Sequence, residues 1–256
     1  MRRARSFLVL YLKCLKRKKT EIKSGNIERN RVMDNNFQNA HFAGAGTVAG
    51  GNYNEVKCSG SVKITGDIKC KRFSCSGAAK AVGNIDCEGA VKTAGAFSSE
   101  GDVSAEIFEA AGAVKIAKSL NAKKIDAAGA IKILGDASAE KAEIHGSVAV
   151  EGLFNADELC LVLDHNSSSD SRISTFGGSY IKVSARRSGW RLFRRSYSLL
   201  KAGLIEADRV ELENTHADTV RTIDAFIGDG CKIGTLEYSG EAKISENAQI
   251  ENIVKM

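Results

Sequence analysis

The chain of 256 residues contains no proline, although average usage of about 5% would predict roughly a dozen. Proline breaks ladders of backbone hydrogen bonds, so its absence leaves few rigid linkers and few places where a ladder must end. Glycine, by contrast, occurs 25 times and supplies tight corners. The composition therefore favours long, continuous ladders of backbone hydrogen bonds, in a chain that makes frequent tight turns.

The sequence also lacks recognisable catalytic and ligand-binding motifs. None of the four histidines, His41, His145, His165 and His216, stands in a nucleophile or metal motif. No G-x-x-x-x-G-K-[ST] loop is present, which argues against a nucleotide-driven filament. The glycine-rich "GAGTVAGG" near residue 44 lacks the strand-turn-helix setting of a phosphate loop. We predict a protein that is not an enzyme and that has no cofactor and no metal.

The start of the chain has no segment long enough to span a membrane. The apolar stretch "SFLVLYLKCL" covers about ten residues, and no small-residue cleavage site comes after it. Seven cysteines without a secretory signal indicate a cytoplasmic protein with reduced thiols. Residues 1–32 share no pattern with the rest of the chain, so they are either a basic leader or untranslated, with Met33 as the true start.

Two short segments carry a strong net positive charge. Residues 1–32 hold eleven Lys or Arg and two Glu, and residues 186–201 hold six Lys or Arg and no acid. Because the whole chain has a net charge of +6, the remainder carries −9. Nucleic-acid binders usually spread positive charge over the folded domain. This distribution argues against nucleic acid and favours local attachment to an anionic surface.

Residues 33–159 contain six copies of one repeat. Each copy carries a glycine, and these glycines lie 17 or 18 residues apart: Gly60, Gly77, Gly95, Gly112, Gly129 and Gly146. Apolar residues keep step with them, as in the column Val62, Ala79, Phe97, Val114, Ile131 and Val148. Such self-similarity is typical of stacked repeat folds.

Within each copy inward and outward residues alternate, which is the period of a strand rather than a helix. Three short strands per copy, separated by glycine or polar corners, predict an all-β solenoid of about 17 residues per coil. Coils would stack about 4.8 Å apart. Small Ala, Cys and Gly side chains are predicted to fill the narrow interior.

Cysteines fall in the inward columns. Cys58 is predicted to stack on Cys75, and Cys70 on Cys87. Such pairs could form a disulfide or bind a metal, but no C-x-x-C and no histidine at ligand spacing accompanies them. We predict that they pack in the core.

Beyond Leu159 the repeat loosens. Residues 166–171 are polar and predict a turn or short excursion, and alternation then returns in coils of uneven length. Residues 160–256 are either a continuing irregular solenoid or a second β-domain, interrupted by a basic amphipathic insertion at residues 186–201.

On a helical wheel, the insertion places Trp190, Phe193, Tyr197 and Leu200 on one face, surrounded by arginines. Segments of this kind lie in a membrane interface or dock on a partner protein. An alternative is a hairpin that packs its aromatic side chains back onto the solenoid. The predicted contact residues are Arg187, Trp190, Arg191, Leu192, Phe193, Arg194, Arg195, Tyr197, Leu199 and Leu200.

The left-handed β-helix of hexapeptide acyltransferases is the rival enzymatic interpretation. Its coils have about eighteen residues, with an aliphatic residue at every sixth position and a catalytic histidine between subunits. Here the inward residues come at spacings of 2 and 4 within coils of seventeen, which argues against that family.

The glycine-cornered coils of "CSGSVKITGDIKCKRFSCSGAAKAVGNIDCEGAV" resemble those of bactofilins, the polymer-forming bacterial cytoskeletal proteins. The closing "IGDGCKIGTLEYSGEAKISENAQIENI" is similar to the end of longer members from Gram-positive spore formers. The resemblance covers residues 40–256 and departs from the family in two ways: proline-rich tails are missing, and the basic insertion interrupts the repeats.

This resemblance implies a right-handed, three-sided β-helix that joins end to end into nonpolar filaments without nucleotide. It also implies a scaffold on the inner face of the cytoplasmic membrane, serving cell shape, wall synthesis or motility. Its implied partners are further copies of itself, the anionic membrane surface, and cell-envelope or motility proteins.

The ends of a solenoid expose strand edges and apolar columns unless they are capped. No charged or proline-bearing cap is evident, so we expect the ends to pair between subunits. The predicted polymer interface comprises Phe37, Phe42, Phe226, Ile227 and Ile250. The alternative is a monomeric solenoid adaptor that recruits one partner through residues 186–201.

Overall fold

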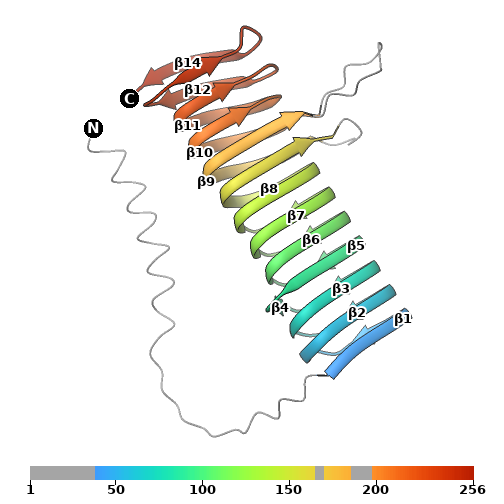
Figure 1. The fold of residues 1–256 in the computed structure, drawn as a ribbon. Helices are drawn as coiled ribbons and strands as arrows, with labels where there is room; N and C mark the ends of the chain where they lie inside the picture. Colours follow the sequence, from blue (N-terminus) through green and yellow to red (C-terminus); the bar gives the residue numbers. More distant parts are fainter. Residues whose placement is uncertain (1–37, 165–169, 186–197) are drawn as a thin grey trace, which may run out of the picture. The chain divides into compact units, whose positions relative to one another are not determined.

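A computed structural model of the chain describes residues 38–164, 170–185 and 198–256. Every element in these ranges is a β-strand, and all fourteen strands belong to one sheet in which each pair is parallel (Figure 1). The strands are β1 Gln38–Val48, β2 Gly51–Ile64, β3 Ile68–Ala81, β4 Ile85–Cys87, β5 Ala90–Ser99, β6 Val103–Ile116, β7 Leu120–Ile133, β8 Ala137–Leu163, β9 Ser171–Ala185, β10 Leu200–Leu212, β11 Thr215–Ile227, β12 Lys232–Tyr238, β13 Ala242–Ile244 and β14 Gln249–Lys255.

Successive coils stack in register, which confirms the predicted β-solenoid. Val62 pairs with Ala79, Ala79 with Phe97, and Ile131 with Val148, so the columns seen in the sequence lie one above another. The strands of Figure 1 accordingly succeed one another along the stack in chain order, with β5 pairing with β3 and β6 alongside β4, and β13 pairing with β11. Each backbone ladder thus runs through most of the molecule.

Three pairs of buried residues surround the interior of each coil. In β6 these pairs are Val103 with Ala105, Phe108 with Ala110, and Val114 with Ile116, each separated by one outward residue. We call the six inward columns A to F, where A and B pass through Phe108 and Ala110, C and D through Val114 and Ile116, and E and F through Val103 and Ala105. The alternation places one outward column between the two members of each pair.

The interior contains several phenylalanine rings, although small Ala, Cys and Gly side chains were predicted to fill it. Phe73, Phe97 and Phe108 form a continuous edge-to-face group, with ring centroids 6.0 and 6.3 Å apart. Phe154 and Phe176 stack at 6.1 Å in the next part of the core. Phe108 shares its coil with the small inward residues Ala105 and Ala110, which leave room for its ring.

The repeated glycines form the corner between columns B and C. From Gly60 to Gly146 the repeated glycines have φ between 123° and 139°, a region that side chains rarely adopt. A Cβ atom on Gly112 would also run into the carbonyl oxygen of Gly95 in the preceding coil. Both the backbone conformation and the close stacking therefore require glycine, which explains the strict repeat.

A second corner, between columns D and E, is held by a ladder of Asp and Asn side chains. The backbone N–H of Asn84 donates to Asp67 Oδ1 at 2.8 Å, that of Asp102 to Asn84 Oδ1 at 2.9 Å, and that of Ser119 to Asp102 Oδ1 at 3.0 Å. Each side chain thus satisfies a backbone donor that the turn would otherwise leave without a partner.

The strands of the second half extend the same sheet. β8 pairs with β9, β9 with β10 and β10 with β11, after a register shift between Val150 and Leu153. Later coils are shorter, with Lys201 paired to His216 and His216 to Lys232. Residues 165–169 and 186–197 connect β8 to β9 and β9 to β10.

The stacked cysteines lie in the core, as predicted. Cys58 pairs with Cys75 and Cys70 with Cys87, and all four are at most 3% exposed as free thiols. Burial, with a smaller effect of Cys75, raises the pKa of Cys58 to about 12. Burial also raises the pKa of Cys231 to about 11. The Cys58 and Cys231 thiols are therefore protonated at neutral pH and poor nucleophiles.

Removing one member of the Asp and Asn ladder should destabilise the fold. Asp102→Ala deletes the acceptor for the Ser119 N–H, and we expect it to lower the free energy of unfolding by about 1 kcal/mol. Asp86→Ala is the matched control, because Asp86 is exposed and forms only a 3.9 Å contact with Lys69. Urea titration should show that the control changes the free energy of unfolding by less than about 0.5 kcal/mol. Equal effects of the two substitutions would contradict a role for the ladder.

The buried thiols should resist modification until the coils open. In a Cys14→Ser variant, which removes the cysteine outside the described residues, we expect Ellman's reagent at pH 8 to reach only the half-buried Cys160 rapidly. A pKa of about 12 leaves roughly one Cys58 thiol in ten thousand ionised at that pH. All six thiols should react in guanidinium. Fast labelling of Cys58 or Cys75 in the native protein would show that the first coils open readily.

Candidate functional site

The C-terminal end of the solenoid is an open apolar surface. β13 and β14 form the last turn, where Ile244 is 40% exposed and Ile253 is 54% exposed. One coil earlier, the residues beneath them are buried: Ile227 is 2% exposed and Leu236 is 0% exposed. Along the described chain, β14 pairs only with β12 and β13 only with β11, so their outer edges are free. We call this surface, formed by Ala242, Ile244, Ala248, Ile250 and Ile253, the C-terminal face.

The N-terminal end is more closed. Phe42 is half-buried, and its ring lies so close to Gly46 that no Cβ would fit there. Val48, in the same first coil, is only 2% exposed. Phe42 therefore covers part of column C at this end. The predicted interface residue Phe37 lies outside the described residues.

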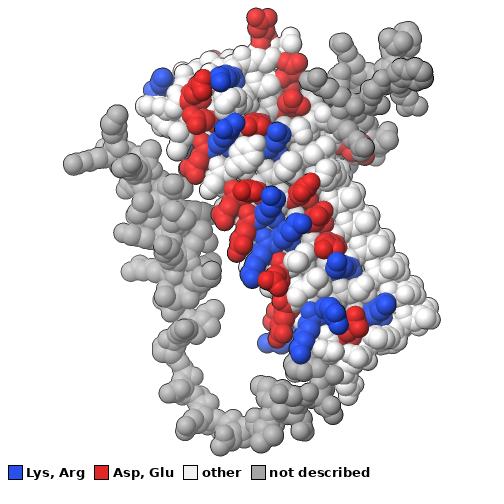
Figure 2. All heavy atoms as spheres, viewed as in Figure 1, with Lys and Arg blue, Asp and Glu red and all other residues white. Residues whose placement is uncertain are grey.

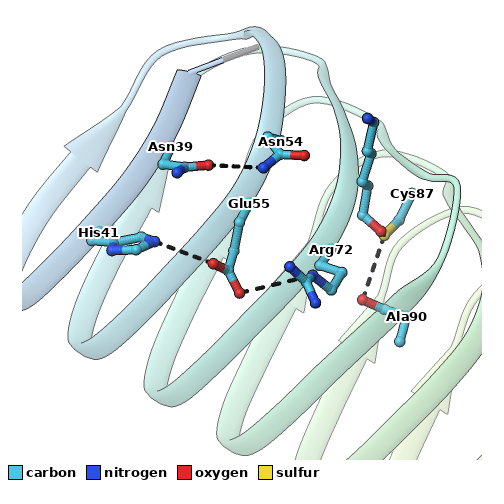
Figure 3. A network of polar contacts seen from close by, with 8 residues as sticks. Asn39, His41, Asn54, Glu55, Arg72, Cys87 and Ala90 are labelled. Carbon is cyan, nitrogen blue, oxygen red and sulfur yellow. Dashed lines mark hydrogen bonds and ion pairs between the residues drawn. The ribbon is translucent and has the colours of Figure 1, made fainter.

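Polar contacts tie the first coil to the next two (Figure 3). Glu55 lies between His41, at 3.3 Å, and Arg72, at 4.0 Å, so that one carboxylate links three coils. Asn54 Nδ2 donates to Asn39 Oδ1 at 3.3 Å. These contacts hold β1 in register at the end of the stack, where only one of its edges pairs within the described chain.

The remaining predicted interface residues do not all reach an end. Ile250 belongs to the C-terminal face, as expected. Ile227 is covered by Ile244 and is buried, so its assignment to the interface was wrong. Phe226 points outward from the side of β11, away from the terminal surface. Ile244 and Ile253 were missed, although each continues an apolar column that the alternation of the sequence shows.

Phe226 lines a shallow groove of about 480 Å³ on the side of the last coils. The Arg209 guanidinium lies 4.6 Å from the centre of its ring, and Lys243 Nζ lies 5.2 Å from it. Lys182 and Glu211, which also line the groove, form an ion pair at 3.0 Å. Burial opposes ionisation of Glu211, but hydrogen bonds from Lys182 and Arg209 lower its pKa overall. The groove presents paired charges and one ring.

The basic insertion falls mostly outside the described residues. Arg187, Trp190, Arg191, Leu192, Phe193, Arg194, Arg195 and Tyr197 all belong to that part. The chain returns at Ser198, and Leu199 is half-buried. Leu200 begins β10 and is 0% exposed, packed in column C between Ser171 and Thr215. Its prediction as a membrane or partner contact was therefore wrong, because the core continues to this residue.

The described histidines lie on the surface. His145 Nε2 lies 3.2 Å from Glu143, and His216 is half-buried between Lys201 and Lys232. In the described ranges, no three His, Cys, Asp or Glu side chains gather as a metal site would require. No helix in those ranges could cross a membrane.

Charges of both signs are interleaved along the face of the molecule shown in Figure 2. Many join neighbouring coils: Lys92 meets Glu109 at 2.7 Å, and Lys141 meets Glu158 at 3.1 Å. Exposed pairs of this kind contribute little stability individually. They do favour the register in which opposite charges stack.

Comparison with known proteins identifies relatives without a described function. No protein-family model matches the sequence, and no solved structure matches it. The chain is 40% identical over 105 residues to the uncharacterized protein YhbF of Bacillus subtilis strain 168, covering 41% of this chain and 42% of YhbF. It is 37% identical over 106 residues to the uncharacterized protein YhbE of the same strain, covering 41% and 44%. The chain thus spans less than half the length of the curated relatives it matches.

Proposed function

We propose that this chain is a bactofilin-like structural protein that assembles end to end into filaments without nucleotide. In this proposal the filament acts as a scaffold on the cytoplasmic side of the membrane, in cell shape, wall synthesis or motility. The open C-terminal face is the observation that carries the proposal. The glycine-cornered coils that resemble bactofilins support it independently.

The C-terminal face combines two features that favour association with a further copy. Ile244 and Ile253 leave apolar surface in water that burial against another coil would remove. The outer edges of β13 and β14 offer backbone donors and acceptors in the geometry that joins every earlier pair of coils. A second solenoid end supplies both kinds of partner, and no cofactor is needed.

Attachment to the membrane is assigned to the basic insertion. Residues 186–201 carry six Lys or Arg and no acid, with Trp190 and Phe193 among them. Aromatic side chains and cations together suit the interface of an anionic bilayer. The described solenoid has a different role in this proposal, which is to present many such segments along one filament.

Charged residues on the C-terminal face should prevent assembly. We expect Ile253→Lys combined with Ile244→Lys to give monomers near the chain mass of 27.4 kDa, because each lysine would have to be buried without a partner. Sedimentation velocity and negative-stain microscopy without nucleotide measure the result.

Ile223→Lys is the control for that experiment, since Ile223 is 48% exposed but lies on β11, whose outer edge is already paired with β12 and β13. It should assemble like the unmodified protein. Monomers formed by the unmodified chain would contradict the filament and favour the adaptor that binds one partner through residues 186–201.

Loss of the aromatic side chains of the insertion should weaken membrane attachment. We expect Trp190→Ser with Phe193→Ser to reduce flotation with anionic liposomes several-fold, because the rings can no longer enter the interface. Ile223→Ser removes an exposed apolar side chain elsewhere and should leave flotation unchanged. If the double variant floats as well as the unmodified protein, the insertion does not anchor the chain through its rings.

A further inference from the structure

One outward column of the solenoid contains no acidic residue and is rich in basic ones. It lies between inward columns C and D, and its members pair in unbroken register through twelve coils. We call it the lysine row: Thr47, Lys63, Lys80, Ser98, Lys115, Lys132, Ala149, Arg172, Lys201, His216, Lys232 and Gln249. Seven of these residues are Lys or Arg, and none is acidic. With coils about 4.8 Å apart, the row is roughly 50 Å long.

Carboxylates neutralise only some of these cations. Lys80 meets Glu100 at 3.0 Å, Lys132 meets Glu151 at 3.6 Å, and Lys201 meets Asp170 at 2.7 Å. No carboxylate of the described chain lies within ion-pair distance of the other four. These are Lys63, Lys115, Arg172 and Lys232.

The four cations without a carboxylate recur at every third coil, about 14 Å apart. All four are exposed. His216 lies between Lys201 and Lys232, and burial together with these two lysines lowers its pKa. It is therefore neutral at pH 7, and the row presents a regular series of available positive charges.

Along the coils from β1 to β7, the corner beside the row carries only small residues. Triplets of Ala, Gly and Ser form it, such as Ala111–Ala113 and Ala128–Ala130, and these residues are exposed. From Ala43–Ala45 to Ala128–Ala130 no side chain of these triplets extends further than a methyl or hydroxymethyl group, whereas the next coil places the exposed His145 at this corner. The lysines next to these triplets have longer side chains, and Lys63 and Lys115 are exposed.

Other outward columns do not share this charge. The column between A and B contains Lys57 and Lys92 but also Glu109, Asp126 and Glu143. Outside residues 1–32 and 186–201 the chain carries a net charge of −9. An anionic surface would thus repel most of the body and attract this row, which fixes an orientation.

The row also lies where the basic insertion joins the solenoid. The chain leaves β9 after Ala185 and returns at Ser198, three residues before Lys201 of the row. Arg172, the neighbour of Lys201 in the row, belongs to the adjacent strand in the stack. The C-terminal end of the insertion therefore meets the solenoid at the corner beside this face.

We propose that the lysine row is a docking face on which the solenoid lies side-on against an anionic lipid bilayer. Each cation near such a surface is attracted to the headgroups, and the attraction falls off within a Debye length. The row runs parallel to the stack of coils, so all of it can meet a plane at once. The inference rests on the proposed membrane association and adds to it the face that meets the lipid.

A bilayer fits this face better than a linear polyanion does. A polymer chain is held best in a groove that tracks its backbone. The groove that the described residues form beside Phe226 and Lys182 lies instead on another side of the coils. The row lies on an exposed strip, beside a corner that is formed by small residues from β1 to β7, and such a strip suits a plane.

Vesicle binding of charge variants tests the proposal. The row variant carries Lys63→Gln, Lys115→Gln, Arg172→Gln and Lys232→Gln. The control variant loses the same charge from other columns, through Lys57→Gln, Lys69→Gln, Lys124→Gln and Lys141→Gln, all exposed. At about 0.1 M salt, where the Debye length is about 10 Å, we expect the row variant to bind phosphatidylglycerol–phosphatidylcholine vesicles at least about tenfold more weakly than the unmodified protein. The control should change less than about twofold, and pure phosphatidylcholine should bind none of the three proteins.

A second measurement uses the unmodified protein and does not depend on the variants folding. Acetic anhydride labelling, followed by mass spectrometry, should show Lys63, Lys115 and Lys232 protected by the anionic vesicles. Lys57 and Lys141 should keep their reactivity. Equal protection of both groups would overturn the side-on orientation.

Each other outcome also decides the matter. If the two variants lose vesicle binding equally, net charge alone explains the loss, and the proposal is overturned. If only Trp190→Ser with Phe193→Ser abolishes binding, the membrane function stands and the lysine row has no part in it. Tighter, row-dependent binding to single-stranded DNA than to vesicles would overturn the lipid assignment. Sedimentation without vesicles measures filament assembly separately, so failure of the filament and failure of the row are distinguishable.

Discussion

Hydrogen bonds between parallel strands of successive coils hold every other feature of this protein in place. Because each strand pairs in register with the strand one coil away, a residue is stacked on its equivalent rather than on an unrelated neighbour. Like side chains therefore accumulate into columns, inward and outward. A property that is slight in one coil, such as one glycine or one lysine, becomes a continuous feature along the stack.

The ladder also defines the ends of the solenoid, where a strand has no partner on its outer edge within the described chain. Inside the stack, each strand satisfies its neighbours on both edges, and the Asp67–Asn84–Asp102 ladder completes one of the corners. At β14 the ladder and the apolar columns end together, and Ile244 and Ile253 of the last turn are left exposed. Phe42 closes part of the opposite end, so the two ends differ in how much apolar surface they leave open. This asymmetry is a property of the monomer that any mode of assembly has to accommodate.

The same constraint explains how charged residues are arranged on the surface of the solenoid. Outward residues within a strand stand about two residues apart, and their nearest neighbours are the equivalent residues of adjacent coils. Charges consequently meet in pairs such as Lys92 and Glu109, which neutralise each other. In the lysine row the column lacks acids, so charge accumulates instead.

Much of this architecture could be predicted from the sequence alone. The spacing of Gly60 to Gly146 and the apolar columns predict the coil, its stacking and the buried cysteine pairs, because register between coils comes directly from the period of the repeat. The basic insertion and its attachment after residue 185 were also evident, since composition changes there abruptly.

Only the tertiary structure decided which residues lie at an end and which charges share a face. Ile227 and Leu200 are apolar residues of the kind found at interfaces. A further coil covers Ile227, however, and the core encloses Leu200. Arg172, Lys201 and Lys232 stand beyond the point where the repeat loosens, so spacing in the chain does not align them with Lys63 and Lys115. The register of the ladders aligns these residues, because hydrogen bonding between coils fixes their position in space even where insertions change the spacing in the sequence.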